Sequence, residues 1–102
     1  MPMEGIKMVV ITAVTAPAAQ KVDFPGLLEE VEFINNGAPN ITVLGHDQEV
    51  LFKAWPGDVW PHRFEDRDYN YLRLYGDVVN TAAEIAANDV LFIRFKLKRR
   101  EA

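Results

Sequence analysis

Apolar and polar residues alternate along several short segments of this chain, and the clearest example lies near its C-terminal end. In DVLFIRFKLKRR (89–100), every second residue from Leu91 to Leu97 is apolar, and Arg94 and Lys96 lie between them. Successive side chains of a β-strand point to opposite faces, so this period of two predicts a strand with one buried and one exposed face. No other feature limits the possible folds as strongly.

Six further segments carry a strand pattern and are bounded by residues that favour turns. Residues 35–40, NNGAPN, predict a turn because Asn and Gly tolerate positive φ angles. Pro56 and Gly57 suit the two central positions of a type II turn, and Pro61 confines its strand to a sheet edge. The remaining expected strands are 5–14, 27–36, 41–45, 50–55, 59–64 and 69–76.

A chain of 102 residues with about seven short strands fits one small all-β domain. We expect a single β-sandwich of jelly-roll or immunoglobulin-like topology. Residues 1–26 are interpreted as an N-terminal arm and connector, and residues 27–100 as the core sandwich. Within 81–87, Thr81 and Glu84 have capping-box spacing, which predicts one short helix, with a loop as the alternative.

Residue types that carry catalysis or bind metals are scarce. The chain has no Cys and no Ser, which excludes thiolate metal sites and nucleophiles of either type. His46 lies beside Asp47 and Glu49, but we interpret this run as a solvated turn rather than a metal site. His62 in HRFED (62–66) belongs to an expected exposed loop. We therefore predict a protein that is not an enzyme and has no catalytic residues, metal site or cofactor.

Segment 5–14 is apolar at nearly every position after Lys7, which predicts a strand covered on both faces. A strand is favoured over a signal peptide because Glu4 precedes the apolar run and the run is short. The two apolar faces of segment 5–14 must then be buried either by the rest of the same domain or by a neighbouring copy of the chain. Residues 1–51 hold two basic and seven acidic residues, and the rest of the chain holds nine basic and eight acidic residues. This asymmetry suits contacts between copies, so we expect a homo-oligomer that exchanges its arm.

Two sets of residues are candidates for contacts with other molecules. Trp55 and Trp60 flank the turn in KAWPGDVWPH (53–62). Burial in the core or at a subunit interface is favoured for them, because one Trp buries roughly 150–250 Å². A stacking platform for a carbohydrate or another small ligand is the alternative. The expected interface comprises the apolar arm, an aromatic strand face and a basic strand face: Met8, Val10, Ile11, Tyr69, Tyr71, Arg73, Tyr75, Arg94 and Lys96.

The order of elements over residues 27–97 resembles that of the small β-sandwich structural proteins of tailed bacteriophages. The resemblance is carried by a strand ending in NNGAPN, a short strand pair with its PGD turn, the aromatic strand YLRLYG and a final hydrophobic strand. It departs at NTAAEIAAN (80–88) and at the apolar segment 5–14. It implies a virion decoration, joining or tail-associated subunit, assembled in the host cytoplasm, whose partners are its own copies and other virion proteins.

The composition argues against two further classes of partner. A net charge of −4 disfavours direct nucleic-acid binding, which needs a wide basic surface. No window has the roughly 18 apolar residues that a membrane-spanning helix needs, so we expect no membrane contact. If the chain is not a virion protein, a cytoplasmic or exported soluble protein is the alternative.

Overall fold

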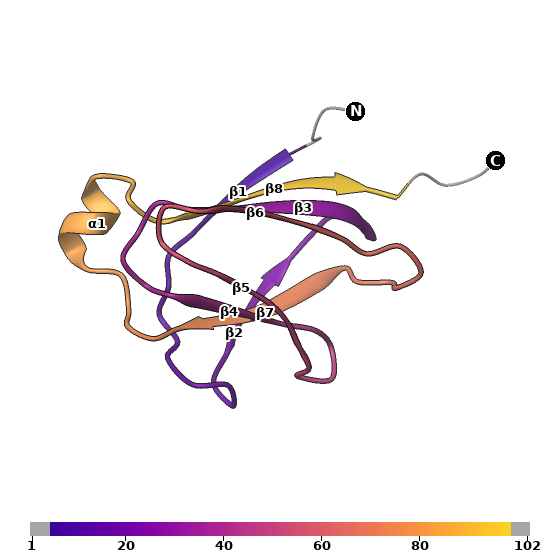
Figure 1. The fold of residues 1–102 in the computed structure, drawn as a ribbon, viewed down its shortest axis with the longest axis horizontal. Helices are drawn as coiled ribbons and strands as arrows, with labels where there is room; N and C mark the ends of the chain where they lie inside the picture. The colour runs from indigo at the N-terminus through magenta and orange to yellow at the C-terminus, as the bar shows by residue number, and fades with distance from the viewer. Residues whose placement is uncertain (1–4, 99–102) are drawn as a thin grey trace.

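Residues 5–98 are described by the computed structural model and form two four-stranded antiparallel sheets packed as layers (Figure 1). Sheet A has the strand order β1-β8-β3-β6, and sheet B has the order β2-β7-β4-β5. A short helix, α1 (Ala82–Ala86), lies beyond one end of the layers (Figure 1). The strands are β1 (Gly5–Val9), β2 (Gln20–Asp23), β3 (Leu28–Asn35), β4 (Ile41–Leu44), β5 (Val50–Ala54), β6 (Val59–Arg63), β7 (Tyr71–Gly76) and β8 (Leu91–Leu97).

The strand pairing is that of a jelly roll. β1 pairs with β8, β2 with β7, β3 with β6 and β4 with β5, all antiparallel. Such nested pairs arise when one long hairpin is rolled into two layers, and the pairs β3–β8 and β4–β7 complete the sheets. The predicted β-sandwich is therefore confirmed, and the chain adopts the jelly roll of the two expected topologies.

The core lies between the two sheets and consists of the side chains that point inward from the alternating strand segments. In sheet A, Val31, Phe33 and Ile93 are completely buried. In sheet B, Val43 and Leu74 are completely buried as well. Burying one such side chain contributes roughly 1.5–3 kcal/mol. The period of two along the sequence therefore corresponds to the division between core and surface in both layers.

Segment 5–14 is not one continuous strand, because β1 covers only its first five residues. Residues 10–14 belong to no strand, and their backbone is bound by the Gln20 and Asn80 side chains and by single backbone bonds from Gly76 and Asn80. Gln20 Oε1 accepts a hydrogen bond from Thr12 N at 2.8 Å, and its Nε2 donates to Val10 O at 2.8 Å. The expected strand is thus wrong in its second half, where side chains and single backbone bonds take the place of sheet pairing.

The expected connector 15–26 contains the strand β2, so the described chain has eight strands rather than about seven. β2 has one buried apolar residue, Val22, between the exposed Lys21 and Asp23. Four residues with a single apolar member do not display a clear period of two. β1 and β2 are both edge strands of their sheets, so part of the expected arm 1–26 belongs to the sandwich itself.

The turn and helix signals agree with the structure at two places. Asp58 N–H donates to Trp55 O at 3.1 Å, and Gly57 has a φ of 83°. This geometry is that of the predicted type II turn. Thr81 and Glu84 form both hydrogen bonds of the capping box, which confirms the predicted helix.

The NNGAPN turn forms for a different reason from the expected one. None of its asparagines has a positive φ angle. Asn35 is instead 1% exposed and binds the backbone of two other segments. Its Nδ2 donates to Pro39 O at 2.7 Å and to Ala54 O at 3.1 Å, and its Oδ1 accepts from Gly37 N at 3.1 Å. This buried amide ties the end of β3 in sheet A to the end of β5 in sheet B.

Candidate functional site

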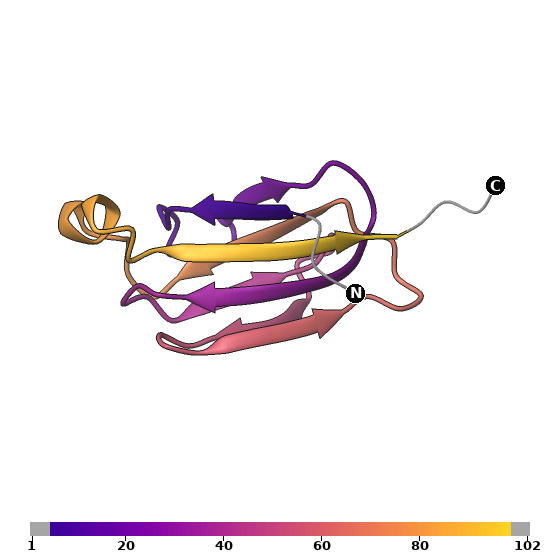
Figure 2. The same ribbon diagram turned by 90° about the horizontal axis from the view of Figure 1, so that it is seen from above.

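The outer face of sheet A carries a row of apolar side chains that crosses all four strands. Met8 of β1 lies opposite Phe92 of β8. Phe92 lies opposite Ile34 of β3, and Ile34 lies opposite Val59 of β6. Met8 is 56% and Val59 is 54% exposed. Figure 2 looks onto this face, and no other described segment of the ribbon lies over it. We call these four residues the apolar row.

Charged side chains lie beside the apolar row on the same face. Arg94 of β8 is in register with Glu32 of β3, and Arg94 Nη1 lies 3.3 Å from Glu32 Oε1. Lys96 is in register with Glu30, and its Nζ lies 2.7 Å from Glu29 Oε2. Strand β8 therefore supplies Arg94 and Lys96, β3 supplies the carboxylates, and Arg63 of the edge strand β6 is a further cation in register with Glu30.

Three of the residues predicted for an interface, Met8, Arg94 and Lys96, lie together on this face. The rest of the apolar row was not predicted, although its signal is present in the sequence. Phe92 falls on the basic side of its alternating segment, and Ile34 falls on the acidic side of its own. An apolar residue on the charged side of a strand marks an outward apolar position.

Tyr71, Arg73 and Tyr75 lie on the outer face of sheet B, on the other side of the sandwich from the apolar row. The His46 imidazole stacks on the Tyr71 ring, with ring centroids 4.1 Å apart and planes 11° apart. Lys21 Nζ lies 4.4 Å from the same ring centroid. His46 is therefore not in a simple solvated turn, as was expected. Six of the nine residues predicted for one interface therefore lie on two separate surfaces.

Two residues predicted for the interface point into the core. Ile11 is 1% exposed and Tyr69 is 5% exposed, so neither offers a surface to a partner. The Tyr69 hydroxyl donates to Glu49 Oε2 at 2.8 Å. This hydrogen bond lowers the pKa of Glu49, whereas burial and then the Glu49 carboxylate raise the pKa of Tyr69. Val10 is half-buried beside a groove of about 400 Å³ between β1 and β2.

The two tryptophans are surface residues, so the core placement, one of the two favoured for them, is wrong. Trp55 is 47% and Trp60 is 41% exposed. Pro61 keeps β6 at the edge of sheet A, as predicted, so the inward side of β6 meets the open side of the sandwich. There the Trp60 ring packs on Phe52, with centroids 6.3 Å apart and planes 19° apart. His62 stacks on the same Phe52 ring at 4.9 Å.

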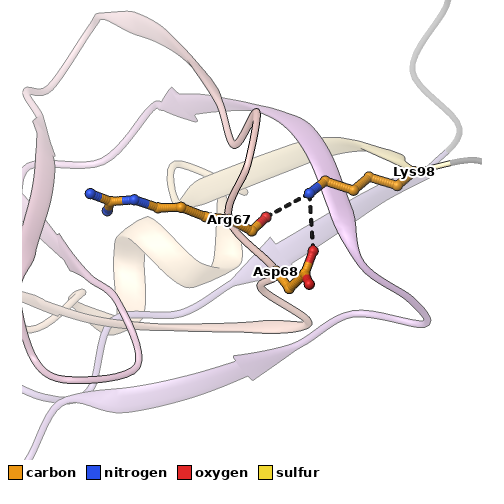
Figure 3. Close-up of polar contacts among 3 residues, drawn as sticks. All are labelled: Arg67, Asp68 and Lys98. Atoms are coloured by element: carbon orange, nitrogen blue, oxygen red, sulfur yellow. Dashed lines mark hydrogen bonds and ion pairs between the residues drawn. The ribbon is translucent and has the colours of Figure 1, made fainter.

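A groove of about 440 Å³ opens beside this β5–β6 edge and is lined in part by residues 62–67. Lys98 fixes the loop that forms its wall (Figure 3). Its Nζ donates to Arg67 O at 2.7 Å and forms an ion pair with Asp68 Oδ1 at 3.2 Å. Burial, followed by the positive charge of Arg67, lowers the pKa of His62. The histidine at this edge is therefore mainly neutral at pH 7.

The described residues, 5–98, contain no group of three His, Asp or Glu side chains that could hold a metal ion. No helix in the same range is long and apolar enough to cross a membrane. No protein-family model, curated protein or solved structure matches the chain. A functional proposal for this chain therefore rests on its own surfaces, which are the outer faces of the two sheets and the β5–β6 edge.

Proposed function

We propose that this chain is a non-catalytic structural subunit that associates with copies of itself through the outer face of sheet A. The observation that carries the proposal is the apolar row. It crosses the full width of the sheet, about 14 Å for three strand spacings, and its end residues, Met8 and Val59, are 56% and 54% exposed. Soluble monomers rarely expose contiguous apolar patches larger than a few hundred Å², and patches above that size mark interaction sites.

The N-terminal strand takes part in this association through its outward side chains. β1 pairs with β8 of its own chain, so the proposed contact needs no exchange of the strand between copies. Met8 contributes as one end of the apolar row. The contact we propose is therefore between two sheet faces, rather than the arm exchange that the sequence suggested.

Surfaces on both sides of the sandwich suit a subunit that contacts more than one neighbour. Tyr71, Arg73 and Tyr75 lie on the outer face of sheet B, and Tyr and Arg are enriched at protein interfaces. A chain with one surface on each side can extend an assembly beyond a single pair. The virion setting of the proposal rests on the resemblance in strand order to tailed-phage structural proteins, and other virion proteins would then bind the sheet B face.

Replacement of Met8 with aspartate is expected to convert the associated protein to a monomer. The new carboxylate would be buried in the interface without a partner, at a cost of several kcal/mol. A loss of about 2.7 kcal/mol already weakens binding about a hundredfold. Sedimentation velocity at micromolar protein concentration measures the mass directly.

The matched control is Val78→Asp, because Val78 is 51% exposed but lies after β7, outside sheet A. This variant should keep the mass of the wild type. A wild-type chain that stays monomeric throughout the micromolar range contradicts the proposal. So does a Met8→Asp variant that keeps the mass of the wild-type oligomer.

A second candidate function is the binding of a small ligand at the β5–β6 edge, and it is favoured by the exposure of Trp60. Phe52 supports the Trp60 ring in a nearly parallel orientation, with planes 19° apart, and the side chain remains accessible at 41% exposure. A supported, accessible aromatic ring can stack against the apolar face of a sugar. The adjacent groove of about 440 Å³ offers charged groups for hydroxyls.

Under this second candidate, cellohexaose, maltoheptaose or chitohexaose should change the tryptophan fluorescence of the wild type. Trp60→Ala should abolish the binding, since it removes the stacking surface. Trp55→Ala is the matched control, because it also removes one exposed indole but leaves the Trp60–Phe52 contact in place. The candidate is rejected if none of the three sugars binds by titration calorimetry.

A further inference from the structure

We infer that two copies pack the outer faces of their A sheets together around a two-fold axis parallel to the strands. This arrangement places β8 of each copy over β3 of the other. The inference rests on the self-association proposed above and adds its geometry. It is carried by the order of apolar and charged residues across sheet A, and not by the apolar row alone.

Among the two-fold arrangements that bring a sheet face against a copy of itself, two keep the strands of the facing sheets aligned. A two-fold axis parallel to the strands reverses the strand order and keeps each row of residues at the same level, so that β1-β8-β3-β6 faces β6-β3-β8-β1. A two-fold axis across the strands keeps the strand order and reverses the direction along each strand. The rows on the outer face fit these two arrangements very differently.

The axis parallel to the strands matches the apolar positions of the two copies. The apolar row of one copy faces the apolar row of the other, with Met8 opposite Val59 of the second copy. In the next row, Ile6, which is 61% exposed, lies opposite Pro61 of the second copy. Both edges of the contact therefore bury exposed apolar residues of β1 against apolar residues of β6.

The same axis makes the charges of the two copies complementary. Arg94 lies opposite Glu32 of the second copy, and Lys96 lies opposite Glu30 of the second copy. The Arg94 side chain is 47% exposed, and its pair with Glu32 of its own chain engages Nη1. A guanidinium has five N–H donors, so Arg94 can bind a second carboxylate at the same time. The symmetry repeats each of these contacts.

The axis across the strands does not pair these charges. It places β8 over β8 and β3 over β3. Depending on the register, Arg94 then faces Arg94, Lys96 or Phe92 of the second copy, or extends past the end of the facing strand, and it never lies directly opposite a carboxylate of β3. Like charges across an interface oppose association and select against that arrangement. The charge pattern therefore selects the axis parallel to the strands.

Charge reversal in a mixture of variants tests these contacts. In a Glu32→Arg homodimer, Arg94 of one copy faces the new arginine at position 32 of the other. In an Arg94→Glu homodimer, the new carboxylate at position 94 faces Glu32 of the other copy. Each variant alone should be monomeric at concentrations at which the wild type associates. Their equimolar mixture should give a one-to-one heterodimer by native mass spectrometry. Mixing the two variants leaves the charges within each chain unchanged. The return of dimer formation in the mixture therefore reports contacts between copies.

Cross-linking between introduced cysteines identifies the axis, because the chain has no cysteine of its own. Packed sheets lie about 10 Å apart, whereas positions 8 and 59 of one chain are about 14 Å apart across three strand spacings. A thiol-reactive linker with a reach of about 10 Å should therefore join a Met8→Cys chain to a Val59→Cys chain in a mixture. Neither variant should cross-link to itself.

The outcomes separate this inference from the proposed function. Heterodimer formation together with cross-linking in the mixture supports the axis parallel to the strands. Self-cross-linking of each cysteine variant would instead place the axis across the strands and overturn the inference. If the wild type forms an oligomer but the cysteine variants do not cross-link, either alone or mixed, the proposed axis is wrong. The proposed self-association is not affected by that result. A monomeric wild type removes the proposed function and this geometry with it.

Discussion

Replacement of Asn35 with leucine is expected to lower the free energy of unfolding by on the order of 4 kcal/mol. The Asn35 side chain is 1% exposed and makes hydrogen bonds to Pro39 O, Ala54 O and Gly37 N. Leucine has a similar size but leaves these three backbone groups without that partner, and each orphaned group costs about 1–3 kcal/mol. A domain of this size has a total stability of only about 5–15 kcal/mol. Urea denaturation followed by circular dichroism measures the change.

The neighbouring asparagine provides the control for this substitution. Asn36 is exposed, so Asn36→Leu should change the free energy of unfolding by no more than about 0.5 kcal/mol. Equal, small effects of the two substitutions would show that water or a local rearrangement replaces the hydrogen bonds of Asn35. That result would contradict the role assigned to the buried amide.

The effect of Asn35 extends to the proposed association face. Its backbone N donates to Asp58 O at 3.2 Å, and its backbone O accepts from Gly57 N at 2.8 Å. These bonds hold the 55–58 turn against the end of β3, next to the register pair of Ile34 and Val59. Leucine keeps these two backbone bonds, so Asn35→Leu reaches the turn through the lost hydrogen bond from Nδ2 to Ala54 O, which directly precedes Trp55.

The sequence predicted most strands, because their backbone partners are other strands and their side chains alternate. It failed where a side chain provides the backbone partner. Residues 10–14 continue the apolar pattern of β1, yet the Gln20 and Asn80 side chains, and not a ladder of strand pairing, bind much of their backbone. β2 was missed because Val22 is its single buried residue. Hydropathy patterns do not report such contacts.

The candidate site was less predictable than the fold, since a surface depends on register between distant strands. Met8, Ile34, Val59 and Phe92 form one row only because four strands pair in a particular order. No local pattern contains that information. The exposure of Trp60 was missed for a related reason. Pro61 correctly indicated an edge strand, and at that edge the inward side of β6, which carries Trp60, lies at the open side of the sandwich.

The second large effect is expected at Phe52, on which Trp60 and His62 both stack. Phe52 is 7% exposed and also contacts Phe33 edge to face, with ring centroids 5.0 Å apart. Phe52→Ala removes a buried ring and leaves a cavity, which should lower the free energy of unfolding by about 3–5 kcal/mol. Chemical denaturation measures this loss, and a change below about 1 kcal/mol would contradict the central place of Phe52 at this edge.

The milder variant Phe52→Leu separates the β5–β6 edge from the association face. Leucine fills much of the same space, so the fold should persist while Trp60 loses its stacking partner. In a Trp55→Phe background the remaining fluorescence comes from Trp60, and its emission should shift to longer wavelength as the ring becomes more hydrated. Phe52 belongs to sheet B and faces the core, whereas association is proposed for the outer face of sheet A. The mass should therefore stay that of the wild type. A Phe52→Leu chain that becomes monomeric would instead place the subunit contact at the tryptophan edge.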